Sequence, residues 1–339
     1  MPHLTFQDFK SDQAVRWCPG CGDHAVLAAL QRALPHVSQA LGYAKERYVV
    51  VSGIGCSSRL PYYMDTYGFH SIHGRATAVS TGIKVANPTL TVWQACGDGD
   101  ALAIGGNHFI HAIRRNIDIN IILFNNRIYG LTKGQYSPTS KFGAITKTSP
   151  YGTVEQPFTP GSLVLGAKGS FFARSLDVEL KLNEEILSAA ALHDGTSVVE
   201  MLTNCVIFND GAHKELSDPA VRADRTIVLR DGEKMLFGKN HEKGLVLEGM
   251  GIKAVTIGED GYTLDDILVH DAHTDNMGLH MMLAEMKGPE LPVALGVIRN
   301  VRQVTYDDAV RDQVLEVTAK SRVHSVDELL HSGSTWEVK

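Results

Sequence analysis

The sequence predicts an α/β fold in which a doubly wound parallel sheet forms one domain over residues 1–210. A C-terminal extension over residues 211–339 is expected to follow it. The composition is that of an ordinary globular protein, since 44% of the 339 residues are hydrophobic and 21% are charged. The stronger observation is an alternation of apolar runs, rich in β-branched residues, with helical stretches. This alternation predicts parallel strands joined by right-handed helical crossovers.

The expected strands are almost continuously apolar, as strands covered on both faces are. They are residues 48–52, 90–95, 120–124, 170–174 and 197–202. The expected helices lie between them, at residues 24–34, 77–85, 101–115 and 178–193. Asp23 is the expected N-cap of the first of these helices, because a carboxylate oxygen can accept from free amides of the first turn.

The extension is more charged and contains turn pairs such as Asp231-Gly232 and Asp260-Gly261. Residues 291–298 are expected to form a further strand, and residues 305–320 an amphipathic helix. The apolar side of that helix would carry Ala309, Val310, Val314 and Val317. With too few strand–helix alternations for a second cofactor domain, the extension is expected to pack on the core or on a partner subunit.

Charge and hydropathy exclude several functions. There are 32 basic and 38 acidic residues, a net charge of −6, which disfavours a nucleic-acid or anionic-membrane surface. No apolar run approaches the roughly 20 residues of a membrane span. The first residues show no export signal, so a cytoplasmic location is expected. Five cysteines, an odd number, favour metal or redox chemistry over a disulfide framework.

Four of the cysteines are placed to meet at one edge of the sheet. Cys18-Pro19-Gly20-Cys21 is a C-x2-C segment before the first helix, Cys56 follows the first strand, and Cys205 follows the fifth. Parallel strands end at a common edge, so these thiolates could bind zinc or an iron–sulfur cluster. Alternatively, Cys56 and Cys205 are buried small hydrophobes, the role expected of Cys96.

A second constellation has the ligands of a magnesium diphosphate site. Gly97-Asp98-Gly99-Asp100 follows one strand, and Asn125-Asn126-Arg127-Ile128 follows the next. The Asp98 carboxylate, the Asn126 amide and the Ile128 carbonyl offer hard oxygen ligands for Mg²⁺. The two glycines would let the backbone approach a diphosphate. Gly-Asp-Gly alone is usually a turn, but this spacing resembles the thiamine-diphosphate fingerprint.

With both constellations present, the chain resembles the β subunit of a 2-oxoacid:ferredoxin oxidoreductase, and most closely one that acts on 2-oxoglutarate. The resemblance covers about residues 10–210. Besides the segments above, it includes residues 53–59 (GIGCSSR), 73–75 (HGR), 129–135 (YGLTKGQ) and 137–139 (SPT).

This resemblance implies a set of cofactors and ligands. It implies a [4Fe–4S] cluster on Cys18, Cys21, Cys56 and Cys205, and Mg²⁺ on Asp98, Asn126 and Ile128. It also implies thiamine diphosphate in a diphosphate-type domain. The cofactor-binding residues would be Ile54, Gly55, Cys56, Ser57, Ser58, Gly97, Gly99, Asp100, Gly130 and Leu131.

The resemblance further implies the reaction and the partners. The reaction is oxidative decarboxylation of a 2-oxoacid with coenzyme A, with electrons passed through the cluster to ferredoxin. An α subunit would carry the pyrimidine-binding domain, in a dimer of αβ heterodimers. Arg59 is expected to bind the distal carboxylate of 2-oxoglutarate, giving succinyl-CoA and CO2, and His73 to act as a proton donor.

Other interpretations stay open at this point. The substrate could be pyruvate or a branched 2-oxoacid, and the reaction could run in reverse as a carboxylation. Arg59 could be a surface or diphosphate-neutralising arginine, and His73 a helix-start residue bonded to backbone. Gly53-x-Gly55 could bind a nucleotide, although Ser58 stands where that pattern needs glycine. The chain could also be a non-catalytic iron–sulfur or zinc scaffold subunit.

Overall fold

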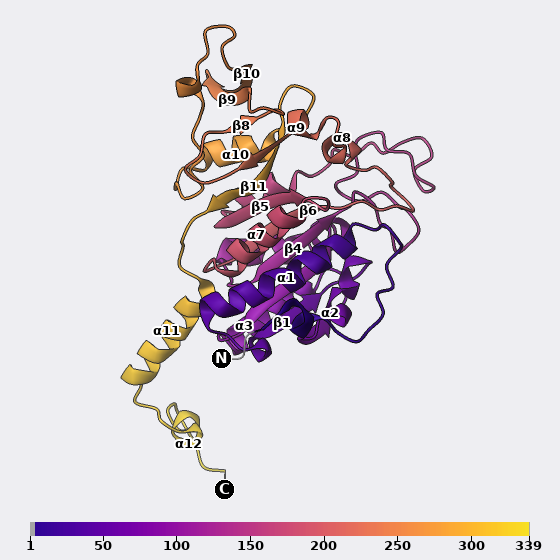
Figure 1. The fold of residues 1–339 in the computed structure, drawn as a ribbon. Coiled ribbons are helices and arrows are strands. Elements are labelled where there is room, and N and C mark those ends of the chain that lie inside the picture. The colour runs from indigo at the N-terminus through magenta and orange to yellow at the C-terminus, as the bar shows by residue number, and fades with distance from the viewer. Residues whose placement is uncertain (1–3, 339) are drawn as a thin grey trace.

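The computed structural model describes residues 4–338 and shows an eight-stranded sheet between two layers of helices (Figure 1). Every pairing in the sheet is parallel except that of β11 with β5, so the predicted fold class is confirmed. In spatial order the strands are β2 (Tyr67–His70), β1 (Tyr48–Ser52), β3 (Thr91–Gly97), β4 (Asn120–Asn125), β6 (Ser197–Leu202), β5 (Phe171–Leu176), β11 (Val293–Asn300) and β7 (Thr226–Leu229).

Helices cover both faces of the sheet, which explains why its central strands are apolar throughout. In β4, Ile122 and Phe124 join the core beneath α1 (Asp23–Leu41) and α7 (Leu180–Ala191). The alternate residues Ile121 and Leu123 join the opposite core. The helices on that side are α3 (Ala76–Ala86), α5 (Gly106–Arg115), α6 (Pro160–Gly166) and α10 (Met277–Glu285).

The remaining helices are mostly short. They are η1 (Phe6–Phe9), η2 (Lys45–Arg47), η3 (Ser57–Arg59), α2 (Leu60–Tyr63), α4 (Asp98–Leu102), α8 (Lys214–Ser217), α9 (Arg222–Arg225), η4 (Leu264–Asp266), α11 (Tyr306–Lys320) and α12 (Val326–Leu330). A separate antiparallel sheet contains β8 (Leu236–Phe237), β9 (Lys243–Glu248) and β10 (Gly251–Thr256).

The five strands expected in residues 1–210 are confirmed, but the single helix expected over residues 101–115 is wrong. The structure has α4 and α5 there, separated by residues 103–105. The helix breaks at Ala103, whose φ of −89° and ψ of −103° are not helical, and the turn brings Gly105 so close that a Cβ there would lie 2.5 Å from the Asp100 carbonyl oxygen. The chain turns tightly at this point, and the turn lies against Gly74 of the loop before α3. The edge strand β2 was not expected either.

Beyond residue 210, the chain adds strands to the main sheet and ends in helices outside it. The strand expected at residues 291–298 is confirmed as β11, which lies between β5 and β7 within the sheet. The expected C-terminal helix is confirmed as α11, which projects away from the sheet (Figure 1). Its expected apolar side is largely exposed, with Val314 at 57% and Val317 at 61%.

Among residues 4–338, no helix combines the length and the apolar character needed to cross a membrane.

Candidate active site at the carboxyl edge of the sheet

The loops that follow β1, β3 and β4 enclose a small pocket of about 50 Å³. Most of the residues predicted to bind the cofactor line it: Ile54, Gly55, Cys56, Ser57, Gly97, Gly99, Asp100, Gly130 and Leu131. The predicted magnesium ligands Asp98, Asn126 and Ile128 line it too. Ser58 does not; it is fully buried, and its carbonyl accepts a hydrogen bond of 2.9 Å from the Ser52 hydroxyl.

Asp98 is a buried carboxylate that two hydroxyls hold in place. The Ser137 hydroxyl donates to Asp98 Oδ2 at 2.5 Å, and the Thr139 hydroxyl donates to the same oxygen. Burial raises the pKa of Asp98, while these hydrogen bonds act in the opposite direction. A buried carboxylate needs a compensating charge or donors, and a bound cation would supply the charge. The site therefore suits a divalent cation.

Asp100 joins three loops of the pocket. Its Oδ1 accepts a hydrogen bond of 2.7 Å from the Gly74 amide, and the Ile54 amide lies near enough to its carboxylate to lower its pKa. Burial raises the pKa of Asp100, and the two amides lower it. Gly53 packs directly on this carboxylate, since a Cβ there would lie 1.7 Å from Asp100 Oδ2. Asp100 thus fixes the loops after β1 and β3 relative to each other.

This contact makes Gly53→Ala an informative change. The methyl group has no space beside Asp100, so we expect a loss of about 1–3 kcal/mol in the free energy of unfolding, as for other overpacked sites. Chemical denaturation measures it. The matched control is Gly106→Ala at the start of α5, where a Cβ meets nothing within 4 Å and stability should not fall. Equal stability of the two variants would contradict the close packing of Gly53 against the Asp100 carboxylate.

Gly99 has no side chain, which leaves space for the Tyr129 ring to pack against the backbone. The Tyr129 hydroxyl donates to the Gly99 carbonyl at 3.0 Å, and a Cβ on Gly99 would lie 2.1 Å from the Tyr129 ring. The sequence suggested that this glycine makes room for a diphosphate. The structure shows that it also makes room for Tyr129, which connects the loop after β4 to α4.

The four predicted cluster cysteines come from three loops that meet beside this pocket. The Gly22 amide donates to the Asn204 carbonyl at 3.1 Å, which ties the Cys18–Cys21 segment to the loop after β6. A Cβ on Gly130 would lie 3.5 Å from Cys205 Sγ and 3.8 Å from Cys56 Sγ. These two thiols therefore flank the same wall residue of the cofactor pocket. Cys96 is fully buried, as expected.

Burial of these thiols favours their protonated form in the absence of a metal. Burial raises the pKa of Cys56 to about 11, with a further contribution from Asp23, and both act in the same direction on the pKa of Cys21. Bound iron or zinc would instead favour the thiolate form, because a coordinating thiol is deprotonated. Among residues 4–338, no three His, Cys, Asp or Glu side chains converge as a single metal ion requires.

The predicted N-cap role of Asp23 is wrong. Asp23 is the first residue of α1, Gly22 occupies the N-cap position, and no side chain caps the helix. Because the chain folds back on Asn204, the Asp23 carboxyl is buried beside Cys21 instead. Burial raises its pKa to about 7, an effect that the hydrogen bond with Cys21 opposes and that nearby Asp177 reinforces.

The two predicted catalytic residues come from different loops near the pocket, and neither lines it. Arg59 is half-buried at the end of η3, where its positive charge lowers the pKa of Cys56. Its guanidinium makes no hydrogen bond or ion pair with other residues in the described range 4–338. His73 is exposed on the loop before α3, and its charge lowers the pKa of Asp100.

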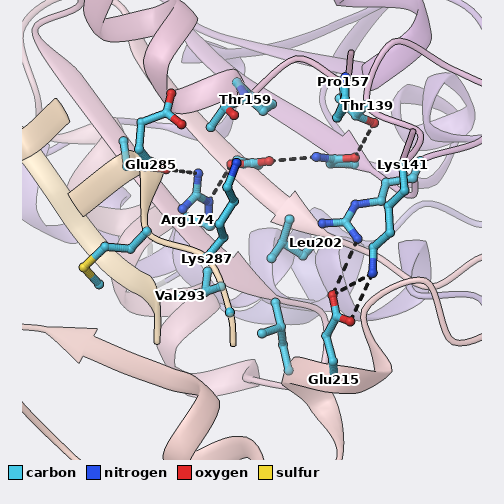
Figure 2. A pocket seen from close by; sticks show the side chains of 18 of the residues that line it. Thr139, Lys141, Pro157, Thr159, Arg174, Leu202, Glu215, Glu285, Lys287 and Val293 are labelled. Atoms are coloured by element: carbon cyan, nitrogen blue, oxygen red, sulfur yellow. Dashed lines mark hydrogen bonds and ion pairs between the residues drawn. The ribbon is translucent and has the colours of Figure 1, made fainter. Parts of the chain in front are cut away.

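A larger cavity of about 700 Å³ was not predicted; Asn125 and Arg127, which flank the predicted magnesium ligand Asn126 in the sequence, line it (Figure 2). Its floor contains Arg174 of β5 and Glu200 of β6, which form an ion pair of 2.7 Å. The sequence did carry a signal, since each is a charged residue within an otherwise apolar strand. The contacts of Ser137 and Thr139 with Asp98 were not predicted either.

The fold and the small pocket that Asp98 lines define a thiamine-diphosphate enzyme. Residues 53–201 match the family model "Thiamine pyrophosphate enzyme, C-terminal TPP binding domain". The chain is 48% identical over 335 residues to the 2-oxoglutarate oxidoreductase subunit KorB of Mycobacterium tuberculosis, covering 98% of this chain and 88% of the relative. It is 49% identical over 189 residues to the 2-oxoglutarate synthase subunit KorB of Archaeoglobus fulgidus, covering 56% of this chain and 69% of that one.

A solved structure agrees with these relatives. It is 2-oxoglutarate:ferredoxin oxidoreductase from Magnetococcus marinus with 2-oxoglutarate, coenzyme A and succinyl-CoA bound. The match has a TM-score of 0.77 at 29% identity and covers 99% of this chain and 98% of that one. The chain therefore belongs to the β subunits of the 2-oxoacid:ferredoxin oxidoreductases, and the resemblance seen in the sequence is confirmed.

Proposed function

We propose that this chain is the cofactor- and cluster-carrying β subunit of a 2-oxoglutarate:ferredoxin oxidoreductase. The reaction is the coenzyme A-dependent oxidative decarboxylation of 2-oxoglutarate to succinyl-CoA and CO2, with electrons passed to ferredoxin. The observation that carries the proposal is that the cysteines lie against a wall of the cofactor pocket. Cys56 and Cys205 flank Gly130, which lines the pocket containing Asp98. The names of the relatives support 2-oxoglutarate as the substrate.

The pocket residues fit Mg²⁺ and the diphosphate of thiamine diphosphate. Asp98, Asn126 and the Ile128 carbonyl would hold the metal, and the backbone at Gly97 and Gly55 would face the diphosphate. A Cβ on Gly55 would meet no atom within 4 Å, so this wall is open. Thiamine diphosphate supplies the carbanion-stabilising chemistry, while the protein supplies placement and charge.

The cysteines fit a [4Fe–4S] cluster by their chemistry and number. Cys18, Cys21, Cys56 and Cys205 would supply four thiolates, the usual ligand set. In such a cluster each thiolate binds a different iron, so the thiols need not converge on one point as zinc would require. Their position beside the cofactor pocket would keep the electron-transfer distance short.

The size of the pocket supports the need for an α subunit. Pockets that enclose a drug-sized ligand have volumes of about 300–1,000 Å³. A pocket of about 50 Å³ is too small to enclose the whole cofactor. We propose that an α subunit with the pyrimidine-binding domain covers the rest, in a dimer of αβ heterodimers. The proposal places this complex and its ferredoxin in the cytoplasm, where thiols stay reduced.

The test uses the αβ complex, purified without oxygen and supplied with coenzyme A, Mg²⁺ and thiamine diphosphate. Viologen reduction is compared between 2-oxoglutarate, pyruvate and a branched 2-oxoacid. We expect strong preference for 2-oxoglutarate. Preference for another acid would keep the chemistry and overturn the substrate. A complex that does not bind thiamine diphosphate would instead indicate a scaffold subunit.

Arg59 is proposed to bind the distal carboxylate of 2-oxoglutarate, since its guanidinium is otherwise unpaired within residues 4–338. For Arg59→Gln we expect KM for 2-oxoglutarate to rise about 10- to 100-fold, because a hydrogen bond to a charged group contributes about 1.5–3 kcal/mol. The KM for pyruvate, which lacks that carboxylate, should change little. Arg47→Gln at the opposite end of β1 is the matched control and should alter neither. Equal losses for both acids would exclude carboxylate recognition by Arg59.

A further inference from the structure

A row of buried polar side chains begins at the floor of the large cavity, where Figure 2 shows Arg174 and Thr139, and ends at the proposed metal ligand Asp98. Arg174 Nε donates to Glu200 Oε2 at 2.7 Å, and Asn125 Nδ2 donates to Glu200 Oε1 at 2.7 Å. Thr139 Oγ1 lies 2.9 Å from Asn125 Oδ1 and also contacts Asp98 Oδ2. Each member touches the next, so the orientation of one constrains its neighbour.

The ion pair at one end of this row calls for a functional explanation. The side chains of Arg174 and Glu200 are only 5% and 2% exposed. A buried ion pair is seldom more stabilising than well-packed apolar residues of similar volume. Arg174 is held at its other end by a hydrogen bond of 3.1 Å to the Ala284 carbonyl. The pair therefore provides a rigid, correctly oriented carboxylate at the centre of an apolar sheet.

The hydrogen-bonding groups of these side chains allow only one orientation of the Asn125 amide within the row. An arginine can only donate, and a carboxylate can only accept. Glu200 therefore requires the NH2 group of Asn125 to face it, which turns Asn125 Oδ1 toward Thr139. The Thr139 hydroxyl has one proton but two acceptors, Asn125 Oδ1 and Asp98 Oδ2.

We infer that Glu200, fixed by Arg174, is a positioning residue that tunes Asp98 as a metal ligand. Through the Asn125 amide it places a second acceptor beside Thr139, which draws the hydroxyl proton away from Asp98. Hydrogen-bond donors and a cation compete for the same carboxylate lone pairs, so Asp98 keeps more charge for the cation. This inference rests on the proposed function, because it assumes that Asp98 binds Mg²⁺.

Glu200→Gln reverses the orientation of the row with almost no change of volume. The introduced amide would accept from Arg174 with its oxygen and present its NH2 to Asn125. Asn125 would then turn its oxygen to this NH2 and its own NH2 to Thr139, leaving the Thr139 proton wholly to Asp98. We expect the Mg²⁺ concentration for half-maximal binding of thiamine diphosphate to rise about tenfold, as for other outer-shell changes. Calorimetric titration of the αβ complex measures it.

A second substitution separates this positioning role from a structural one. Thr139→Val removes the contested proton, so Glu200→Gln combined with Thr139→Val should recover most of the Mg²⁺ affinity lost in Glu200→Gln. Two merely structural changes would add their losses, and such additivity would overturn the inference. Should Glu200→Gln not fold, Asn125→Leu removes the same acceptor. It should cause the same loss, and wild-type affinity in that variant would overturn the inference.

The matched control breaks a partly buried ion pair at the opposite edge of the sheet. Lys84 Nζ lies 2.5 Å from Asp118 Oδ2, and Asp118→Asn should leave the Mg²⁺ affinity unchanged. The titration also separates the two proposals. If the wild-type complex did not bind thiamine diphosphate with Mg²⁺, the proposed function would fail. If it bound and Glu200→Gln bound equally well, only the positioning role would fail.

Discussion

Asp98→Asn is expected to weaken Mg²⁺-dependent binding of thiamine diphosphate by more than about a hundredfold. Loss of an outer-shell partner of a metal ligand typically costs about 10- to 100-fold in metal affinity, and Asp98 is proposed as a direct ligand. Viologen reduction by the αβ complex should fall at least in proportion. Calorimetric titration with thiamine diphosphate at several Mg²⁺ concentrations measures the binding.

The same substitution should not destabilise the cofactor-free protein. Asp98 is buried, and burial raises its pKa, so its charge is held at a cost in stability. An uncharged amide avoids that cost and still accepts from Ser137 and Thr139 through its oxygen. The midpoint of thermal unfolding without cofactor should therefore stay equal or increase. The increase that Mg²⁺ and thiamine diphosphate cause in the wild type should disappear.

Asp307→Asn is the control for this result, because Asp307 is also a buried carboxyl whose pKa burial raises. It lies near the other edge of the sheet, where it accepts from the Asp118 amide at 3.1 Å. It should retain cofactor binding. An Asp98→Asn variant that bound thiamine diphosphate with wild-type affinity would remove Asp98 from the metal site.

Cys205→Ser is expected to abolish electron transfer while thiamine diphosphate binding persists. A serine hydroxyl is a poor substitute for a thiolate, and three remaining cysteines leave one iron without its ligand. We expect visible absorbance and bound iron to fall to background in the αβ complex, with viologen reduction lost. Thiamine diphosphate binding should change less than about tenfold, because Cys205 does not line the cofactor pocket.

Cys96→Ala is the matched control, since Cys96 is fully buried in β3 and its thiol donates to the Ile122 carbonyl of the neighbouring strand. It should keep the cluster. Analysis of the metal content distinguishes the alternatives. Zinc in place of iron in the wild-type complex would support the scaffold interpretation, whereas unchanged iron in Cys205→Ser would exclude Cys205 as a ligand.

Much of the candidate site could be predicted because it is local in the sequence. Asp98 and Asn126 each follow an apolar strand directly, and parallel strands bring such positions to one edge. The C-x2-C segment likewise places Cys18 and Cys21 together whatever the rest of the fold does. The five strands β1, β3, β4, β5 and β6 followed from periodicity alone, because both faces of the sheet are covered there.

Contacts between distant segments could not be predicted in this way. The partners of Asp98 are Ser137 and Thr139, about 40 positions along the chain, and no periodicity indicates them. The close approach of Gly74 to Gly105 in the break after α4 is likewise revealed only by the packed structure. Strand β11 enters the main sheet antiparallel to β5 from almost 120 residues away.

The sequence by itself determined the class of fold, the family and the identity of the residues that could bind metal and cofactor. Only the tertiary structure decided how those residues are held. Arg174 and Glu200 appear as two isolated charges in apolar strands, yet the parallel register of β5 and β6 sets them side by side. The physical reason is that residue type specifies what a side chain can bind, whereas long-range packing specifies which partner it meets and in which orientation.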